Sequence, residues 1–252
     1  MPRITSDNFP LLHGDKNGYP ANIVFQDGAE FPLFSSGIIS ADKINQQAEQ
    51  VAAEISACFS RLLIVQVLEG ARMFCSRVCF FLDKMKKSYK RAGIKVMSYS
   101  GTRAGSRKIV TPLLDDAGRQ LDNLAQYDVV VIDDLIDAGN TMVWLMDNYL
   151  SLFTPRSISA AFMLEKNRKR SVEVNKFIAA NHIIRGKLAA DEWLVGFGLD
   201  ISLEGPDKSI HLFRKLPEVY AFNRGIERRF FKEYNDNPLF FIRQMRSYIS
   251  ED

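Results

Sequence analysis

The stretch VVVIDDLIDAGNT, residues 129–141, decides the fold, because it joins a short apolar run to a cluster of acidic and small residues. Four β-branched residues in a row, 129–132, predict a strand that is buried in a sheet. Ligands bind at the carboxyl ends of strands in open α/β sheets, so Asp133 and Asp134 are expected at a binding edge. The residues from Asp137 to Thr141 are predicted to turn into a helix, and the backbone N–H groups of such a turn bind a phosphate dianion.

Strand-like and helix-like segments alternate along the chain. This alternation predicts an α/β fold with a mainly parallel, doubly wound sheet that carries helices on both faces. Helices are expected over residues 41–60, 71–93 and 141–153, and strands over 62–68, 94–99, 129–132, 157–165, 182–186 and 193–200. Gly93 is expected to cap the second helix, and residues 101–108 to form a flexible polar loop. Residues 1–40 are turn-rich, and the chain becomes charged, aromatic and helix-like from about residue 223.

Composition and charge exclude several functional classes. The chain has 252 residues, of which 46% are hydrophobic, enough for a sizeable core. A formal net charge of +3 is too small to argue for nucleic-acid binding. No apolar stretch approaches the roughly 20 residues that span a bilayer, and the N-terminus lacks the apolar segment of a signal peptide. Three cysteines (Cys58, Cys75 and Cys79) fit reduced thiols, so a cytoplasmic protein is expected.

The stretch 129–141 closely resembles the phosphoribosyl-pyrophosphate-binding motif of type I phosphoribosyltransferases, a strand, two acidic residues and a loop similar to D-T-G-x-T. Three further segments, in the same order, narrow the resemblance to hypoxanthine-guanine phosphoribosyltransferases: LLIVQVLEGARMF (62–74), FMLEKNRKRSVEV (162–174) and WLVGFGLD (193–200). The resemblance covers about residues 40–222 and implies that family's fold. Residues 1–222 would form the phosphoribosyltransferase domain, with 1–40 and about 175–222 contributing to a small hood, followed by a C-terminal helical extension over 223–252.

The resemblance also implies roles for individual residues. Asp137 would lie near purine N7 as the general base or acid. Lys166 would donate to the exocyclic O6, Trp193 would stack on the purine, and Leu194 would read the base edge through its backbone. The other implied contacts are those of Asp133 and Asp134 with the ribose hydroxyls and the Mg²⁺ shell, Asp200 with Mg²⁺, Ala138, Gly139, Asn140 and Thr141 with the 5′-phosphate, Leu68, Glu69 and Gly70 with pyrophosphate, and Ser98 and Tyr99 at the start of a mobile lid. A non-proline cis peptide is one option for residues 68–70.

These roles imply a purine salvage enzyme that is similar to the family. It would transfer a phosphoribosyl group from phosphoribosyl pyrophosphate to hypoxanthine or guanine, giving the purine nucleoside monophosphate IMP or GMP and pyrophosphate. Mg²⁺ would be the cofactor, because it stabilises the leaving group while positive charge builds on the sugar. Besides these substrates and products, the resemblance implies a homodimer or homotetramer, with no membrane or nucleic-acid partner.

Several residues depart from the family pattern. Glu69 stands where a basic residue is usual, and Ala138 stands where a threonine is usual, which removes a hydroxyl donor worth about 1 kcal/mol. Asp133 replaces the glutamate that is common there. No arginine matches the one that the family places after Asp200, and Lys208 is offset from that spacing.

Alternatives to each interpretation remain open. The acidic turn could be structural, with Asp137 serving only to cap a helix. A regulatory protein could keep this fold as a nucleotide sensor, with the basic and aromatic residues of 223–252 contacting RNA. A helical hairpin packed on the domain or on a partner subunit is favoured for that segment. A transferase acting on another base, such as xanthine or a pyrimidine, is the third possibility.

Overall fold

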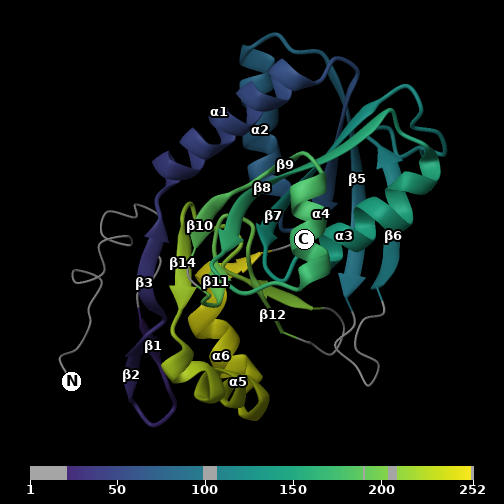
Figure 1. Cartoon of the computed structure of the whole chain (residues 1–252). Helices are drawn as coiled ribbons and strands as arrows, with labels where there is room; N and C mark the ends of the chain where they lie inside the picture. The colour runs from purple at the N-terminus through teal and green to yellow at the C-terminus, as the bar shows by residue number, and fades with distance from the viewer. Residues whose placement is uncertain (1–21, 99–106, 190, 204–208, 251–252) are drawn as a thin grey trace. The chain divides into compact units, whose positions relative to one another are not determined.

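The structure is a computed structural model that describes residues 22–98, 107–189, 191–203 and 209–250 (Figure 1). The chain divides into two compact units, residues 45–191 and residues 1–44 with 192–252. The predicted α/β architecture with a mainly parallel sheet is confirmed, and the sheet belongs to the unit 45–191. Among the described residues, no helix combines the length and the apolar character needed to cross a membrane.

The central sheet has the strand order β10-β8-β7-β4-β5-β6, with β9 paired to β8. Its strands are β4 (Leu62–Leu68), β5 (Tyr89–Ser98), β6 (Arg107–Asp115), β7 (Asp128–Ile136), β8 (Ser157–Lys166), β9 (Ile183–Ile184) and β10 (Lys187–Ala189). All neighbouring pairs are parallel except β5 and β6. The carboxyl ends of β4, β7 and β8 therefore meet at one edge, where ligands bind in open α/β sheets.

Helices pack on both faces of this sheet because its strands are apolar on both sides. The helices that lie wholly or mostly in this unit are α1 (Ala41–Cys58), α2 (Arg72–Lys84), α3 (Asn140–Val143) and α4 (Val172–Ala180). Helix α3 continues as a π-helical turn, Trp144–Tyr149, and a 3-10 turn, Leu150–Phe153. Leu63, Val129 and Phe162 share one buried cluster with residues of this helical run and of α4. Figure 1 draws α3 and α4 in front of the sheet, and α2 packs against β4 and β7 outside that cluster.

A buried carboxylate anchors the amino end of β7. Asp128 accepts hydrogen bonds from the backbone N–H groups of Ser60 and Arg61, each at 3.1 Å, and from the guanidinium of Arg156 at 2.7 Å and the hydroxyl of Ser157 at 2.9 Å. Burial alone would raise the pKa of Asp128, but these donors outweigh it and lower that pKa to about 2. The start of β7 is thereby fixed to the residues that precede β4 and to the start of β8.

The second unit is built from short antiparallel strands and two helices. Its elements are β1 (Asn22–Val24), β2 (Glu30–Pro32), β3 (Phe34–Ile39), β11 (Leu194–Val195), β12 (Ile201–Leu203), β13 (Ile210–Leu212), β14 (Val219–Phe222), α5 (Glu227–Asp236), α6 (Pro238–Met245) and β15 (Ile249–Ser250). Phe230 of α5 and Phe241 of α6 lie in one buried cluster with Phe34, Phe213 and Phe222. The segment 223–250 therefore packs into the core of this unit, and β15 pairs with β13.

A predicted helix and a predicted loop next to the central sheet are wrong in their bounds. The helix expected over 71–93 ends at Lys84, because Lys86 adopts a left-handed φ of 56° and Lys87 N–H bonds back to Leu82 O at 2.9 Å. Gly93 is not a helix cap but lies inside β5, paired with Gln66 of β4. Arg107 and Lys108, expected in a loop, begin β6 because that strand finds an antiparallel partner in β5.

The strand expected over residues 193–200 is also shorter than predicted. Only Leu194 and Val195 form a strand, β11, and it joins an antiparallel sheet with β14 and β3 rather than the central sheet. Gly196 and Gly198 then adopt left-handed φ values of 95° and 101°. A Cβ at Gly196 would lie 2.0 Å from Glu218 O, so only glycine fits this turn.

Candidate active site

Asp133 and Asp134 lie within β7, which is the neighbour of β4 in the sheet. Asp133 pairs in register with Phe162 of β8, and its Oδ1 accepts a hydrogen bond of 2.9 Å from the backbone N–H of Asp134. Burial and the neighbouring charge of Asp134 raise the pKa of Asp133 well above its usual range. A cation or ligand hydroxyls at this pair would relieve the repulsion between the two carboxylates.

The loop from Asp137 to Thr141 follows β7 and opens α3, as predicted. Gly139 stands at the start of α3 with a left-handed φ of 80°, and a Cβ there would meet the Val174 side chain at 2.6 Å. The loop therefore requires glycine both for its φ and for its contact with α4. Residues 137–142 line a cavity of about 280 Å³, which Asp133 and Arg107 also line. The sequence-predicted phosphate loop thus borders an open space.

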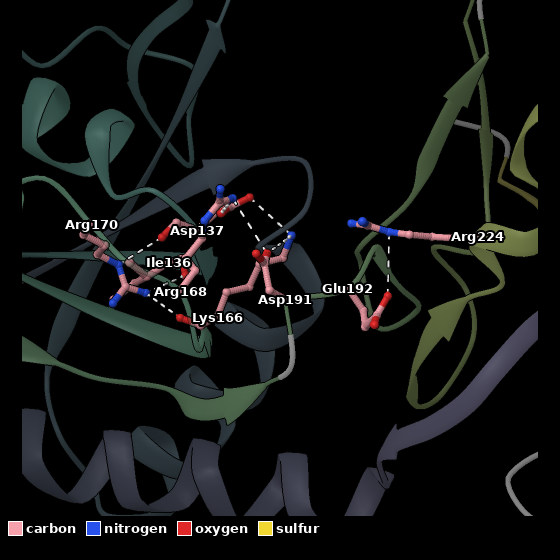
Figure 2. Close-up of polar contacts among 8 residues, drawn as sticks. All are labelled: Ile136, Asp137, Lys166, Arg168, Arg170, Asp191, Glu192 and Arg224. Carbon is pink, nitrogen blue, oxygen red and sulfur yellow. Dashed lines mark hydrogen bonds and ion pairs between the residues drawn. The ribbon is translucent and has the colours of Figure 1, made fainter.

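Asp137 is held by two cations at the carboxyl end of β8 (Figure 2). Nζ of Lys166 lies 3.3 Å from its Oδ2, and Nη1 of Arg168 lies 2.5 Å from its Oδ1. Both cations also lie near Asp191, at 3.9 and 3.8 Å. Burial acts to raise the pKa of Asp137, but the hydrogen bond from Arg168 and the charge of Lys166 outweigh it and lower that pKa below its usual value. Asp137 is therefore an ionised carboxylate, able to accept a proton.

A buried arginine, which the sequence analysis did not single out, fixes the backbone of this loop. Arg170 donates to the carbonyl of Asp137 at 3.0 Å, of Ile136 at 3.3 Å and of Lys166 at 2.9 Å, as Figure 2 shows. Its charge is balanced by Glu165, which is 3% exposed and also pairs with Arg185. Arg170 therefore connects the ends of β7 and β8. Its only signal in the sequence is its place among the basic residues of the range 166–170, and such a cluster equally suits a solvated turn.

The segment 68–70 lies at the same edge of the sheet. The peptide bond between Leu68 and Glu69 is cis, which is the option that the resemblance left open. A Cβ at Gly70 would meet Oδ2 of Asp134 at 1.9 Å, so this backbone lies directly against the acidic pair and needs glycine. Glu69, the departure from a basic residue, forms an ion pair with Arg72 of α2.

The remaining predicted residues of the unit 45–191 fall at the end of β5. Ser98 is its last residue and pairs with Arg107 of β6. Tyr99 lies outside the described residues. The structure thus brings Asp133, Asp134, Asp137, the loop 138–141, Lys166 and the segment 68–70 to one edge of the sheet.

The predicted base-binding residues Trp193 and Leu194 belong to the other unit. The Trp193 ring stacks on Phe231 of α5, with centroids 5.8 Å apart and an interplanar angle of 25°, and meets Phe222 edge to face. The Trp193 carbonyl accepts a hydrogen bond of 2.8 Å from Phe222 N–H, and Leu194 pairs with Ala221. One face of the indole is therefore covered by Phe231 of the C-terminal segment.

Asp200, the third predicted metal ligand, is also in that unit and is already paired. Its Oδ2 lies 2.6 Å from His211 Nδ1, 3.2 Å from Arg214 Nη2 and 3.0 Å from the Ser202 hydroxyl. No arginine stands after Asp200 at the spacing of the family, yet the hairpin β12–β13 brings Arg214 back to it. The spacing in the sequence does not identify this arginine, because the hairpin lengthens the connection between it and Asp200. Lys208, the other candidate, lies outside the described residues.

The acidic residues fit Mg²⁺ only as a partial ligand set. Within the described ranges, no group of three His, Cys, Asp or Glu side chains could hold a metal ion by itself. Mg²⁺ in proteins commonly takes one or two carboxylates and completes its shell with water and substrate phosphates. The adjacent carboxylates of Asp133 and Asp134, with the raised pKa of Asp133, suit that arrangement.

Comparisons with known proteins agree with this geometry. A hypoxanthine-guanine phosphoribosyltransferase of Aquifex aeolicus is 27% identical over 193 residues, which cover 73% of this chain and 92% of that protein. A hypoxanthine phosphoribosyltransferase of Escherichia coli is 27% identical over 161 residues, covering 63% of this chain and 80% of the relative. A solved hypoxanthine phosphoribosyltransferase of Staphylococcus aureus shares the fold with a TM-score of 0.60 at 22% identity, over 77% of this chain and 94% of that one.

The family assignment rests on the sequence itself. The match to the phosphoribosyl transferase domain extends over residues 38–202 and contains the acidic strand, the phosphate loop, Lys166 and the segment 193–200. This match covers more than half of the chain and includes the residues that gather at the edge of the sheet. The chain therefore belongs to the phosphoribosyl transferase domain family.

Proposed function

We propose that this chain is a purine salvage enzyme, which transfers a phosphoribosyl group from phosphoribosyl pyrophosphate to hypoxanthine or guanine. The products are IMP or GMP and pyrophosphate. One observation carries the proposal: Lys166 Nζ lies 3.3 Å from Asp137 Oδ2, at the end of the strands that also present the acidic pair and the loop 138–141. The cation that we propose to read the base and the carboxylate that we propose to accept the proton are thus neighbours, and Asp137 also lines the cavity of about 280 Å³.

The protein's own groups account for the reaction as follows. N9 of the base forms a bond with C1′ of the ribose as the bond from C1′ to the pyrophosphate oxygen breaks, and the proton of N7 moves to the Asp137 carboxylate. General-base assistance of this kind is worth ~10²–10⁴ in rate. The lowered pKa of Asp137 keeps it ionised before the step. Lys166 donates to O6 of the base, and the loop 138–141 binds the 5′-phosphate through its N–H groups.

The acidic pair would hold the cofactor and the sugar. Asp133 and Asp134 would bind the ribose hydroxyls and Mg²⁺, which when bound supplies positive charge to the leaving pyrophosphate. Asp200 is the proposed metal ligand of the other unit. Its partner Arg214 is our candidate for the pyrophosphate-binding arginine that the family has after this aspartate. The contacts of Trp193 and Leu194 with the base rest on the family resemblance.

The proposal extends to the setting of the enzyme. The three cysteines are free thiols, which supports a cytoplasmic location. Assembly as a homodimer or homotetramer is proposed from the resemblance alone.

The decisive experiment is a screen of free bases. Purified protein is incubated with phosphoribosyl pyrophosphate and Mg²⁺, and hypoxanthine, guanine, xanthine, adenine and uracil are added one at a time while the ultraviolet spectrum is followed. Turnover with hypoxanthine or guanine is the expected result, with the nucleotide product identified chromatographically. Turnover with xanthine or uracil alone would assign another base. Tight nucleotide binding without turnover of any base would instead make the protein a sensor.

A further inference from the structure

Arg107 is placed at the cavity of the phosphate loop by a strand that the sequence did not predict. It is the first residue of β6 and pairs with Ser98 at the end of β5. Side chains alternate between the faces of a strand, so Arg107 points to the same face as Ile109, which packs against the cluster beneath α3. The adjacent Lys108 points the other way and is exposed. Arg107 and Lys108 are therefore two cations of one strand with opposite surroundings.

Arg107 lines the same cavity as the loop 138–141. Its Nε is buried and has no hydrogen-bond partner within the part of the chain that the structure describes. Buried donors are nearly always paired in folded proteins, so this guanidinium keeps unused hydrogen-bonding capacity in a residue that lines an open cavity. A volume of about 280 Å³ is several times the roughly 30 Å³ that one water molecule occupies. The cavity is therefore large enough for an anionic group such as a phosphate together with part of the molecule to which it is attached.

The other charges of the cavity favour an anion near Arg107. Asp137 also lines it, but the cations Lys166 and Arg168 already balance that carboxylate. Asp133 also lines the cavity, and its proposed partners are the ribose hydroxyls and Mg²⁺ rather than the phosphate. Arg107 is thus a side-chain cation of the cavity whose charge no ion pair balances among the described residues. Guanidinium groups bind phosphate oxygens with short, charge-assisted hydrogen bonds.

We infer that Arg107 is a further binding residue, which donates to the phosphate monoester held by the loop 138–141 and offsets the hydroxyl that Ala138 lacks. This inference rests on the proposed function for the identity of the ligand, a ribose 5-phosphate group. The loop contributes backbone N–H groups, and Arg107 contributes the charged donor that a threonine at position 138 would replace only in part.

The test compares Arg107→Gln with Lys108→Gln, which removes an equal charge one residue away. Binding of ribose 5-phosphate is measured by calorimetry. Loss of a charge-assisted hydrogen bond should weaken it about tenfold to a hundredfold in Arg107→Gln and leave Lys108→Gln unchanged. Arg107→Lys, which keeps the charge, should retain most of the affinity. Unaltered affinity in Arg107→Gln would overturn the inference.

A second arm separates a binding role from a structural one. Ala138→Thr should regain about fivefold in binding when added to Arg107→Gln and less when added to the wild type, because the hydroxyl then replaces a missing donor. In turnover, Arg107→Gln should raise KM for phosphoribosyl pyrophosphate more than it lowers kcat, with an unchanged melting temperature. A lowered melting temperature without any change in ribose 5-phosphate affinity would assign Arg107 to the fold.

The two proposals fail in different ways. Ribose 5-phosphate binding that depends on Arg107, without turnover of any base, would support the inference and remove the proposed transferase. Turnover of hypoxanthine or guanine with an unaffected Arg107→Gln variant would remove the inference alone. A wild-type protein that neither binds ribose 5-phosphate nor turns over a base would remove both.

Discussion

Arg168 donates a hydrogen bond of 2.5 Å from its Nη1 to Oδ1 of Asp137, the carboxylate that we propose as the general base. Arg168 is exposed, and it was one of several basic residues in a cluster that the sequence alone could not resolve. Its contact lowers the pKa of Asp137, together with the charge of Lys166 and against the effect of burial. The base is therefore ionised over a wider range of pH than an unpaired carboxyl in the same place.

The first prediction follows from this pair. Because Arg168 lowers the pKa of Asp137, Arg168→Gln should raise that pKa, and the acidic limb of the profile of kcat/KM against pH should move to higher pH. Activity near neutral pH should change less. The measurement is the pH profile with hypoxanthine, and Lys169→Gln serves as the control that removes a neighbouring exposed charge. An acidic limb at the same pH in both variants would separate Arg168 from the titrating group.

The second prediction concerns the carboxylate itself. Asp137→Asn keeps the size of the side chain but removes the proton acceptor, so kcat should fall by ~10²–10⁴. Binding of the nucleotide product should stay within several-fold, because the loop 138–141 is unchanged. Steady-state turnover and calorimetry measure the two quantities. Nearly full turnover by the Asn variant would exclude Asp137 as the base.

The third prediction concerns the metal. Activity should vanish with a chelator and return with Mg²⁺, because this ion favours oxygen ligands and substrate phosphates. Asp200→Ala should raise the Mg²⁺ concentration for half-maximal activity by ~tenfold or more. Ser202→Ala, which removes only a 3.0 Å hydrogen bond to Asp200, is the matched control. The same Mg²⁺ titration in wild type and Asp200→Ala would remove Asp200 from the metal site.

The fourth prediction concerns stability. The pKa of Asp128 is about 2 in the folded chain and close to 3.9 when unfolded, so its ionised form stabilises the fold by roughly 2–3 kcal/mol above pH 4. That contribution should be lost as the pH falls from about 4 through 2. Asp128→Asn should lower the free energy of unfolding at pH 7 and flatten its pH dependence in this window. Denaturant unfolding at several pH values measures both, and parallel pH curves for the two proteins would contradict the assignment.

The parts of the fold and site that the sequence predicted are those with local causes. Asp133, Asp134 and the loop 138–141 follow a buried β-branched run, so their position at the end of a strand depends only on neighbours in sequence. Gly93 was wrongly assigned to a helix end, because the helix already ends at Lys84 and the left-handed φ beyond it is adopted by Lys86 rather than by a glycine. The loop-to-strand boundary at Arg107 depends on pairing with β5, which local pattern does not encode.

The same distinction explains which site residues were missed. Arg214 meets Asp200 only because the hairpin β12–β13 folds the chain back on itself, so no fixed spacing identifies it. Arg170 differs from the exposed Arg168 and Lys169 by being buried against Glu165. Phe231 contacts Trp193 across 38 positions of sequence, and it lies in a segment beyond the residues that resemble the family. Each of these contacts is long-range or depends on burial.

The last prediction tests base recognition, and it separates two residues that lie in different units. Lys166→Ala should remove a charge-assisted hydrogen bond to O6, which costs roughly 1.5–3 kcal/mol, or about tenfold to a hundredfold in kcat/KM for hypoxanthine and guanine. Adenine carries an amino donor where O6 stands, so the wild-type protein should reject it, since two donors would face each other.

Trp193→Ala should instead weaken the binding of every purine to a similar extent, because stacking on the face of a ring depends little on the substituents of the base. The loss should be the ~0.5–1.5 kcal/mol of an aromatic pair together with the lost burial. Trp193→Phe is the control, since a phenyl ring retains a stacking face while Phe231 still packs behind it. Steady-state kinetics with hypoxanthine, guanine and adenine distinguish the two patterns: a change in specificity for Lys166→Ala and a uniform loss for Trp193→Ala. Wild-type protein that used adenine as readily as hypoxanthine would overturn the assignment of a 6-oxopurine substrate, even with every phosphate contact intact.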